Sequence, residues 1–283
     1  MLQKLLTMML VYAVMIYTPT TPDNLKCLTR ECFGERFPRF FRQKLIWDSD
    51  STCKNTSSGK FSSKSGYPWK KRSLVRSKGY QTVFVRTFVD GAFVPSSVAT
   101  IRQAYNAGLG IEVFIDPQPF SSLQGSQQLD IMVQALHDNG IVVRTVWITA
   151  VNPATNWPTD KVMNTIFINS ILIRARQLGL NVGIYTNVYD WGQITSNWTG
   201  AGSDVFLWYW NVSAAGPAGE SAPNFDDYVA FGGFNTVLAK LFGLAESECQ
   251  LPVNRNVYSV GVALKKDLFT APDGKIVVGG IGL

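Results

Sequence analysis

The sequence predicts an α/β fold built on a largely parallel sheet, arranged either as a barrel or as a doubly wound sheet. Segments rich in β-branched and aromatic residues alternate along the chain with helical segments of about 10–15 residues, a pattern typical of parallel sheets. The strand segments are continuous apolar runs, as expected for strands that are buried on both faces. In both arrangements, functional residues gather at the carboxyl ends of the strands.

Each element is predicted from a local pattern. β-Branched and aromatic residues predict strands at residues 80–88, 111–115, 142–151, 181–186 and 205–212, and two short closing strands at 235–244 and 252–259. Apolar residues at helical spacing, each time followed by a glycine, predict helices at residues 95–107, 126–139 and 161–178. A shorter helix is expected at 191–198, with Asp190 as its N-cap. Pro272, Asp273 and Gly274 predict a turn near the C-terminus.

Composition divides the 283 residues into four parts. Residues 1–20 contain an apolar run that is too short to span a bilayer and is typical of a signal peptide, which predicts a protein secreted to an extracellular, gut-lumen or lysosomal compartment. Residues 21–78 form a basic, Ser- and Lys-rich leader without helical or strand periodicity. Residues 79–260 contain the predicted barrel domain, and residues 261–283 form a C-terminal tail. No other run is long enough to cross a membrane, so we expect no stable membrane insertion.

The net charge of +6 belongs to the leader rather than to the predicted domain. Residues 22–78 contain 14 Lys and Arg against 5 Asp and Glu, whereas residues 79–283 contain 11 against 15. This balance gives no reason to expect nucleic acid as a partner of the globular part. Four cysteines suit an oxidising compartment, and the sequence leaves their pairing open: Cys27, Cys32, Cys53 and Cys249.

Several blocks of the predicted domain resemble the lysozymes of glycoside hydrolase family 25, in particular the branch found in nematodes and amoebae. The blocks are VWITAVNP at residues 146–153, VGIYTN at 182–187, LWYW at 207–210 and VNRNVY at 253–258. They follow one another in the family's order over residues 80–258. The resemblance implies an irregular (β/α) barrel, a muramidase activity on bacterial peptidoglycan, and a role in defence against bacteria or in their digestion.

The residues that the family uses as acids are replaced in this chain. The resemblance places an Asp-x-Glu motif at the end of the fourth strand, where this sequence has Thr149 and Val151. It places a further Asp near the last strand, where this sequence has Asn254 or Asn256. These departures remove charge from the expected site, which argues against hydrolysis by the family mechanism.

The family's first strand, which carries another Asp, has no recognisable counterpart directly before residue 79. We therefore expect the barrel without this strand. Strand 80–88 should then have an exposed edge.

Two other carboxylates are candidates for catalysis. Asp116 stands at the carboxyl end of strand 111–115, where functional residues of parallel sheets belong, and Glu112 lies on the same strand face. Their backbones are about 13 Å apart, which is too far for a retaining pair of carboxylates and long for an inverting pair. The alternatives are that Asp116 caps the turn before Pro117 and that Glu112 is solvated.

Aromatic side chains predict a sugar-binding groove because their faces stack on sugar rings. The resemblance places Tyr185, Asn187 and Trp208 in that groove, and Trp147 and Trp210 are further candidates. The alternative is that the rings belong to the core. The one histidine of the chain, in helix 126–139, suits the helix dipole, so we expect neither a metal site nor a cofactor.

The sequence thus favours a secreted, monomeric, lysozyme-like barrel whose partner is bacterial cell-wall glycan. One hypothesis is a muramidase that uses other acids than the family's. The second is a non-catalytic glycan-binding or immune protein on a hydrolase scaffold. A third is a barrel enzyme for another substrate, which rests on the versatility of the fold alone.

Overall fold

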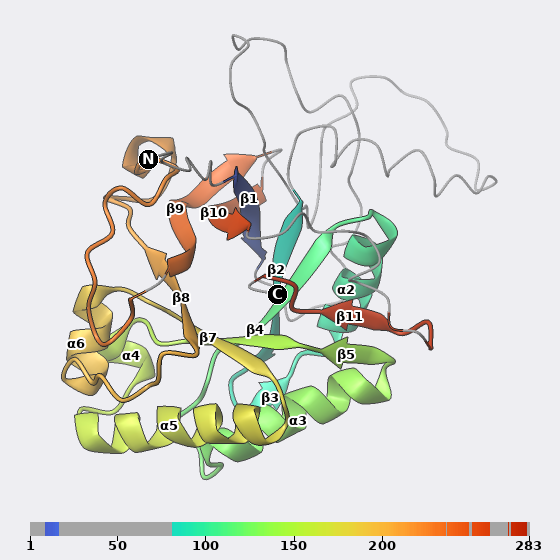
Figure 1. Cartoon of the computed structure of the whole chain (residues 1–283), viewed down its shortest axis with the longest axis horizontal. Coiled ribbons are helices and arrows are strands. Elements are labelled where there is room, and N and C mark those ends of the chain that lie inside the picture. The colour runs from blue at the N-terminus through green and yellow to red at the C-terminus, as the bar shows by residue number, and fades with distance from the viewer. Residues whose placement is uncertain are drawn as a thin grey trace, which may run out of the picture.

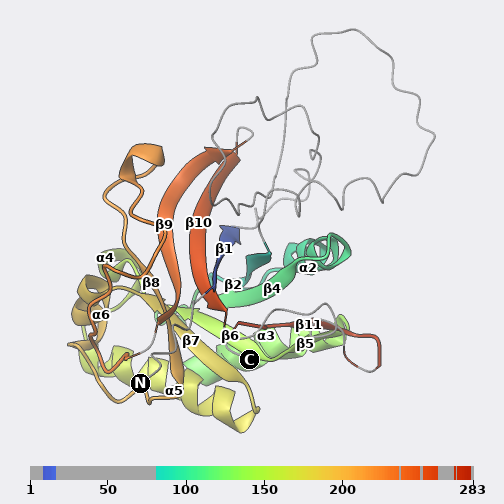
Figure 2. The same cartoon turned by 45° about the horizontal axis from the view of Figure 1, so that its top comes forward.

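The computed structural model describes residues 9–16, 81–235, 237–248, 251–260, 271 and 273–281 (Figures 1 and 2). Its main sheet contains nine strands in the order β1-β10-β9-β8-β7-β6-β4-β2-β3, and β1 also pairs with β2. Strands β2, β4, β6, β7, β8 and β9 run parallel, whereas β10 is antiparallel to β9 and to β1. Because β1 pairs with both β10 and β2, the sheet curls into an irregular barrel, as the sequence predicts. The strands are β1 Met9–Ile16, β2 Thr82–Val89, β3 Ala92–Phe93, β4 Gly110–Ile115, β6 Thr145–Thr149, β7 Asn181–Thr186, β8 Val205–Trp210, β9 Val237–Glu248 and β10 Leu251–Val260.

The expected exposed edge on strand 80–88 is wrong over the first half of β2. Strand β1 pairs in parallel with residues Thr82 to Val85 of β2 and antiparallel with β10. It comes from the segment that we predict to be a signal peptide, and an apolar run of this length suits a buried strand as well as an h-region. The barrel therefore takes its missing strand from the N-terminus rather than from the residues directly before β2.

Helices cover the outside of the sheet (Figure 1). They are α2 Ser96–Asn106, α3 Gly125–Asp138, α4 Pro153–Asn156, α5 Lys161–Gln177 and α6 Val188–Thr195, with a 3-10 turn, η3, at Pro217–Gly219. Helices α3 and α5 lie against each other at Gly125, where an added Cβ would come within 2.5 Å of the Ile171 side chain. This close approach lets two helices that run in the same direction share one face of the barrel.

The strand expected at 142–151 is divided: β5, Ile141–Val143, pairs with β11, Ile276–Val278, in a separate two-stranded sheet, and only β6 joins the barrel. The division occurs because the C-terminal segment binds here, with Arg144 N–H donating to the Val278 carbonyl. The turn predicted before β11 is confirmed, because Gly274 N–H donates to the Ala271 carbonyl.

The short helix expected at 191–198 begins three residues earlier, at Val188. Asn187 is its N-cap, because the Asn187 side chain accepts a hydrogen bond of 2.7 Å from the Asp190 N–H. The prediction that Asp190 caps this helix is therefore wrong. Asp190 lies in the first turn, which frees its carboxylate for other contacts.

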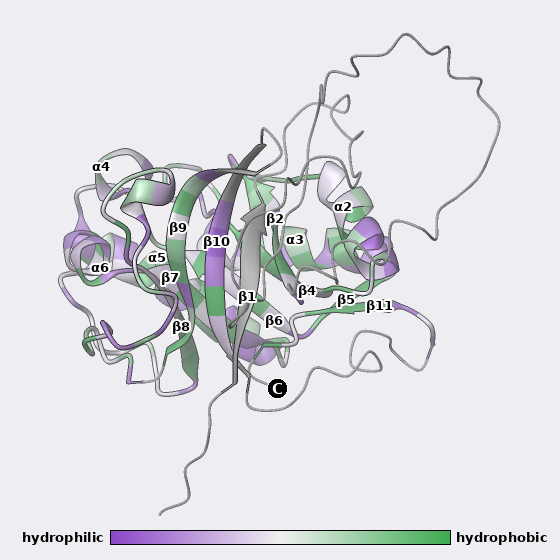
Figure 3. Ribbon diagram, turned by 90° about the horizontal axis from the view of Figure 1, so that it is seen from above, coloured by the Kyte–Doolittle hydropathy of each residue, from purple (hydrophilic) through white to green (hydrophobic). Residues whose placement is uncertain are grey.

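The structure has two apolar clusters, one between the sheet and the helices and one inside the barrel. The inner cluster contains large aromatic rings from several strands: Phe84, Phe114, Trp147, Tyr185, Trp208 and Tyr258. Figure 3 shows a hydrophilic stretch in β10, which contains Asn254, Arg255 and Asn256. The interior is thus packed rather than open, and the amide of Asn256 enters it from the middle of β10.

Candidate active site

Asp116 and Thr149 meet at the carboxyl end of the barrel. Ile115 pairs with Ile148 across β4 and β6, so the next residues of both strands, Asp116 and Thr149, stand side by side. The Thr149 hydroxyl donates to Asp116 Oδ1 at 2.6 Å and also lies 3.3 Å from the Ile115 carbonyl oxygen. The side chain at the position of the family's Asp is therefore hydrogen bonded to a carboxylate from the neighbouring strand.

Arg86 completes this group from β2. Its Nη1 donates to Asp116 Oδ2 at 3.2 Å. Burial raises the pKa of Asp116 above its ordinary value, although the Thr149 hydroxyl and the Arg86 guanidinium both favour the ionised form. Asp116 is thus a partly buried carboxylate, its side chain 24% exposed, with a cation on one side and a hydroxyl on the other, rather than a simple turn cap.

Asp190 is a second carboxylate at the same end of the barrel. Trp210 Nε1, at the end of β8, donates to Asp190 Oδ2 at 3.2 Å, and the backbone N–H of Asn152 donates to the same carboxylate. The residue is only 4% exposed. Burial raises its pKa, and the two N–H donors oppose that effect. Asn152 directly follows Val151, so this carboxylate lies beside the position of the family's Glu.

Glu112 does not join these residues. It is 1% exposed and lies near the beginning of β4, away from the carboxyl ends of the strands. Trp147 Nε1 donates to its Oε2 at 2.8 Å, and the N–H groups of Gly280 and Ile281 donate to its Oε1 at 2.6 and 2.8 Å. These contacts join Glu112 to the core and to the C-terminal segment, so the solvated position considered for Glu112 is wrong. We do not assign Glu112 to the active site.

We predict that Glu112 makes the stability of the protein fall between about pH 4.5 and 7. Burial raises the pKa of Glu112 from 4.5 to about 7, against the opposing effect of its three N–H donors. The folded state therefore binds this proton more tightly than the unfolded state, so the contribution is complete below pH 4.5 and is lost as the pH rises to 7. A change of this size corresponds to about 3 kcal/mol.

Thermal unfolding of the wild type and of Glu112→Gln at pH 5 and pH 8 measures this contribution. The amide cannot ionise, so the fall in Tm between the two pH values should be smaller in the variant. Equal falls in both proteins would contradict the prediction.

Two of the predicted groove residues belong to the core instead. Trp147 and Trp208 are completely buried, and their rings meet edge to face at a centroid distance of 5.9 Å. An added Cβ at Gly183 would come within 2.3 Å of the Trp147 ring, so this ring lies flat against the backbone of β7. Neither ring can offer a face to a sugar. The prediction for these two residues is wrong because strand alternation turns them into the barrel.

The remaining groove candidates lie at the carboxyl ends of β7 and β8. Tyr185 is 6% exposed and packs on Trp208 at a centroid distance of 4.3 Å. Trp210 and Asn187 are partly exposed, and Trp210 is next to Asp190 through its ring N–H. Among the predicted residues, Trp210 and Asn187 are therefore the ones available to a ligand without rearrangement.

The asparagines of β10 have structural partners. The Asn254 side-chain oxygen accepts a hydrogen bond of 2.8 Å from the Ala245 N–H, and Asn256 Oδ1 accepts one of 2.9 Å from Trp208 Nε1. Both residues are buried. The amides thus support the core at a place where the family resemblance implies an acid.

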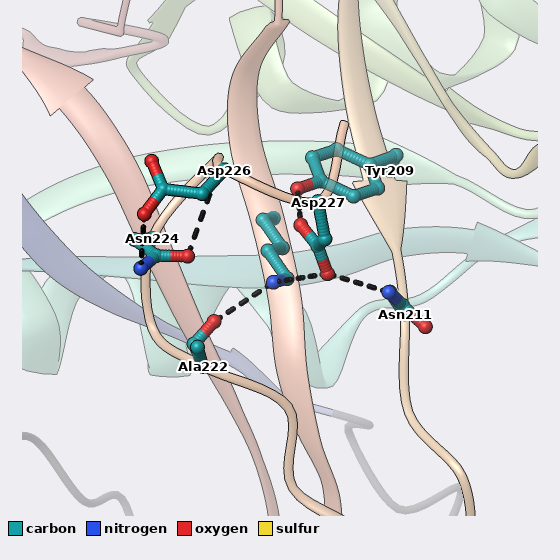
Figure 4. A network of polar contacts seen from close by, with 7 residues as sticks. Tyr209, Asn211, Ala222, Asn224, Asp226 and Asp227 are labelled. Carbon is teal, nitrogen blue, oxygen red and sulfur yellow. Dashed lines mark hydrogen bonds and ion pairs between the residues drawn. The ribbon is translucent and has the colours of Figure 1, made fainter. Parts of the chain in front are cut away.

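A polar network that the sequence patterns do not predict lies outside the barrel (Figure 4). Asp227 accepts hydrogen bonds from the Tyr209 hydroxyl at 2.5 Å, Asn211 Nδ2 at 2.5 Å and Lys240 Nζ at 2.7 Å. Lys240 also donates to the Ala222 carbonyl at 2.8 Å and is fully buried. The network fastens the long loop after β8 to the outer face of β8 and β9. Its only sequence signal is a lysine within an apolar strand.

The described residues contain neither a cluster of three potential metal ligands nor a helix long and apolar enough to cross a bilayer. The carboxyl end of the barrel holds two carboxylates, a guanidinium group and a hydroxyl group. These are the groups of acid–base chemistry on a sugar bond.

The fold and the site define an α/β-barrel protein of the glycoside hydrolase type. Residues 67–242 match the family model described as Lysozyme-like protein 1. Lysozyme-like protein 1 of Caenorhabditis elegans is 50% identical over 222 residues, which cover 74% of each chain, and Lysozyme-like protein 2 of the same organism is 52% identical over 71% of this chain and 74% of its own. The chain belongs to this lysozyme-like family.

More distant relatives agree with the family 25 resemblance. A probable GH family 25 lysozyme of Dictyostelium discoideum is 26% identical over 64% of this chain and 81% of its own. Among solved structures, a muramidase from Trichobolus zukalii has a TM-score of 0.52 at 17% identity, covering 66% of this chain and 86% of its own. A lysozyme from Streptomyces coelicolor has a TM-score of 0.51 at 21% identity, covering 68% and 87%. These two structures share the fold of this protein.

Proposed function

We propose that this protein acts on bacterial peptidoglycan at the carboxyl end of its barrel, in innate defence or in the digestion of bacteria. Membership of the lysozyme-like family supports a cell-wall glycan as the partner. The location of Asp116 and Thr149 at the carboxyl ends of parallel strands supports this end as the site of action.

The hydrogen bond between Thr149 and Asp116 carries this proposal. The family's acid is absent at position 149, yet a carboxylate from β4 lies 2.6 Å from the Thr149 hydroxyl. A carboxyl group is thus kept at the expected place although the residue that supplies it has changed. In the catalytic form of the proposal, Asp116 is the carboxylate on which turnover depends.

A second candidate function is a non-catalytic glycan-binding protein on the same scaffold. It is favoured by Val151, which cannot transfer a proton, and by the ion pair of Asp116 with Arg86, which occupies one carboxylate oxygen. In this form, Asp116 and Trp210 contact the glycan without cleaving it.

Clearing of Gram-positive cell walls, measured beside pull-down on insoluble peptidoglycan, tests both functions. We expect the wild type to do both, and Asp116→Asn to bind while its clearing rate falls about 10²–10⁴-fold, the usual contribution of an acid–base group. Asp138→Asn is the matched control, because the Asp138 side chain is 62% exposed and lies in α3.

The outcomes separate the candidates. Binding without clearing by the wild type supports the glycan-binding function and excludes the catalytic one. Neither binding nor clearing contradicts both.

A further inference from the structure

Three segments at the carboxyl end of the barrel meet at the Asp190 side chain. Asp190 lies in the first turn of α6, which follows β7. Its carboxylate accepts the Trp210 Nε1–H at 3.2 Å, from the end of β8, and the backbone N–H of Asn152, from the loop after β6. Strands β6 and β8 are the two neighbours of β7 in the sheet. One side chain therefore joins three adjacent strand ends.

The backbone on both sides of this contact is held in place. The loop after β6 adopts the left-handed conformation at Asn152, where φ is 56°. Residues other than glycine keep this conformation only where the surrounding structure supports it, and the hydrogen bond to Asp190 supplies such support. On the other side, the Asn187 side chain accepts the Asp190 N–H at 2.7 Å. Asp190 is thus a buried acceptor at a fixed position.

Trp210 differs from the two tryptophans inside the barrel. Trp147 and Trp208 are completely buried, whereas Trp210 is partly exposed and packs against the inner cluster. Val151, at the position of the family's Glu, also packs against this cluster and is partly exposed. The carboxyl end of the barrel therefore has an aromatic and an aliphatic surface that solvent reaches. Surfaces of this kind suit the C–H face of a neutral sugar ring.

We infer that Asp190 is a positioning residue whose carboxylate holds the edge of the Trp210 ring and so fixes this ring as the stacking platform for a neutral sugar of the glycan. The inference rests on the proposed action on peptidoglycan and adds a subsite and the residue that orders it. Ordering the ring before the glycan arrives strengthens binding, because less side-chain freedom is lost in the complex. In this role Asp190 accepts hydrogen bonds and transfers no proton.

The first test measures the affinity for soluble glycan strands from Gram-positive peptidoglycan by calorimetry. Asp190→Ala removes the acceptor, and Trp210→Phe removes the donor while it keeps an aromatic ring. Each substitution should weaken binding about 3–10-fold, the range expected when one side chain must become ordered on binding. The double variant should bind about as weakly as Asp190→Ala, because both substitutions remove the same hydrogen bond. Losses that multiply in the double variant would overturn the inference.

Tryptophan emission reports on the ring itself. We expect the emission of the wild type to change when glycan strands are added, and Trp210→Phe to lose this change. Asp190→Ala should diminish it, which a loss of stability alone would not do. Trp198→Phe is the matched control and should keep the change, because Trp198 is also partly exposed but packs against the cluster between the sheet and the helices. An emission change that persists in Trp210→Phe overturns the platform, whether or not Asp190→Ala folds.

Asp190→Asn separates positioning from proton transfer. The amide oxygen can still accept the indole N–H, so this variant should recover most of the affinity that Asp190→Ala loses. An Asp190→Asn protein that binds as weakly as Asp190→Ala would contradict the inference. One that binds like the wild type but no longer clears cell walls would assign proton transfer to Asp190 and overturn the positioning role.

Failure of this inference and failure of the proposed function give different results. A wild type that neither binds glycan strands nor clears cell walls overturns the proposed function itself. A wild type that binds glycan strands, with Asp190→Ala and Trp210→Phe binding equally well, overturns the positioning role and leaves peptidoglycan as the partner.

Discussion

Replacing Asp227 by alanine is expected to lower the free energy of unfolding by about 3 kcal/mol or more. The substitution leaves the Lys240 ammonium, whose side chain is 0% exposed, with the Ala222 carbonyl as its remaining described hydrogen-bond partner. It also removes the acceptor of the Tyr209 hydroxyl and of Asn211 (Figure 4). A buried charge without its counter-ion is costly because the interior cannot solvate it.

A double-mutant cycle isolates this pair. Lys240→Met keeps most of the apolar stem, so we expect the double variant Asp227→Ala with Lys240→Met to be more stable than Asp227→Ala alone. Asp226→Ala is the matched control, because Asp226 is exposed and bonds only to its neighbour Asn224 among the contacts described. Urea denaturation measures the free energy of unfolding of the wild type and of these four variants. Equal losses of stability for Asp226→Ala and Asp227→Ala would contradict the prediction.

The same pair predicts a loss of stability in acid. Burial opposes ionisation of Asp227, but Lys240, Tyr209 and Asn211 together lower its pKa below 3.8. The folded state therefore binds this proton less tightly than the unfolded state. The contribution is present above about pH 4 and is lost as the pH falls through the folded pKa, and the Asp227→Ala variant should lack it.

Trp208→Ala is expected to lower the free energy of unfolding by about 3–5 kcal/mol. The ring is fully buried and packs on Phe84 and Tyr185 at centroid distances of 4.1 and 4.3 Å. Its removal opens a cavity inside the barrel and deprives Asn256 of the indole N–H at 2.9 Å. The effect is on the fold, because neither face of the ring is open to a ligand.

Trp210→Ala is the matched variant for Trp208→Ala. Trp210 is partly exposed and adjoins Asp190 at the carboxyl end, so we expect weaker pull-down on peptidoglycan with a smaller loss of stability. Chemical denaturation measures the free energy of unfolding of both variants, and pull-down measures their binding to peptidoglycan. A Trp208→Ala protein of wild-type stability that no longer binds peptidoglycan would show that the ring lines a groove after all.

Local patterns determined the repeating part of this fold. The strand predicted at 181–186 has those bounds in the structure, because the local composition of the run between Gly179 and Asn187 favours a strand. Helix α5 also lies where the helical spacing and the following glycine predict it, from Lys161 to Gln177. The four sequence blocks that resemble the family occur in the family's order. They identified the barrel and the positions, Thr149 and Val151, at which the family's acids are replaced.

Only the tertiary structure decided which distant segments pair with each other. Residues 142–151 look like one strand, yet the C-terminal segment, more than a hundred residues later, divides it. The first strand comes from residues 9–16, whose composition also fits a signal peptide. Both outcomes depend on pairing between distant segments, and local composition carries no information about the partner.

In the candidate site, too, some features followed from the sequence and others only from the tertiary structure. The sequence by itself determined that Asp116 ends a strand, that aromatic residues fill the ends of β7 and β8, and that Thr149 and Val151 cannot act as acids. It did not determine that Trp208 faces inward or that Asp190 turns toward Asn152 and Trp210. Side-chain direction and proximity follow from strand register, barrel closure and the start of α6, and these arise only when the whole sheet packs.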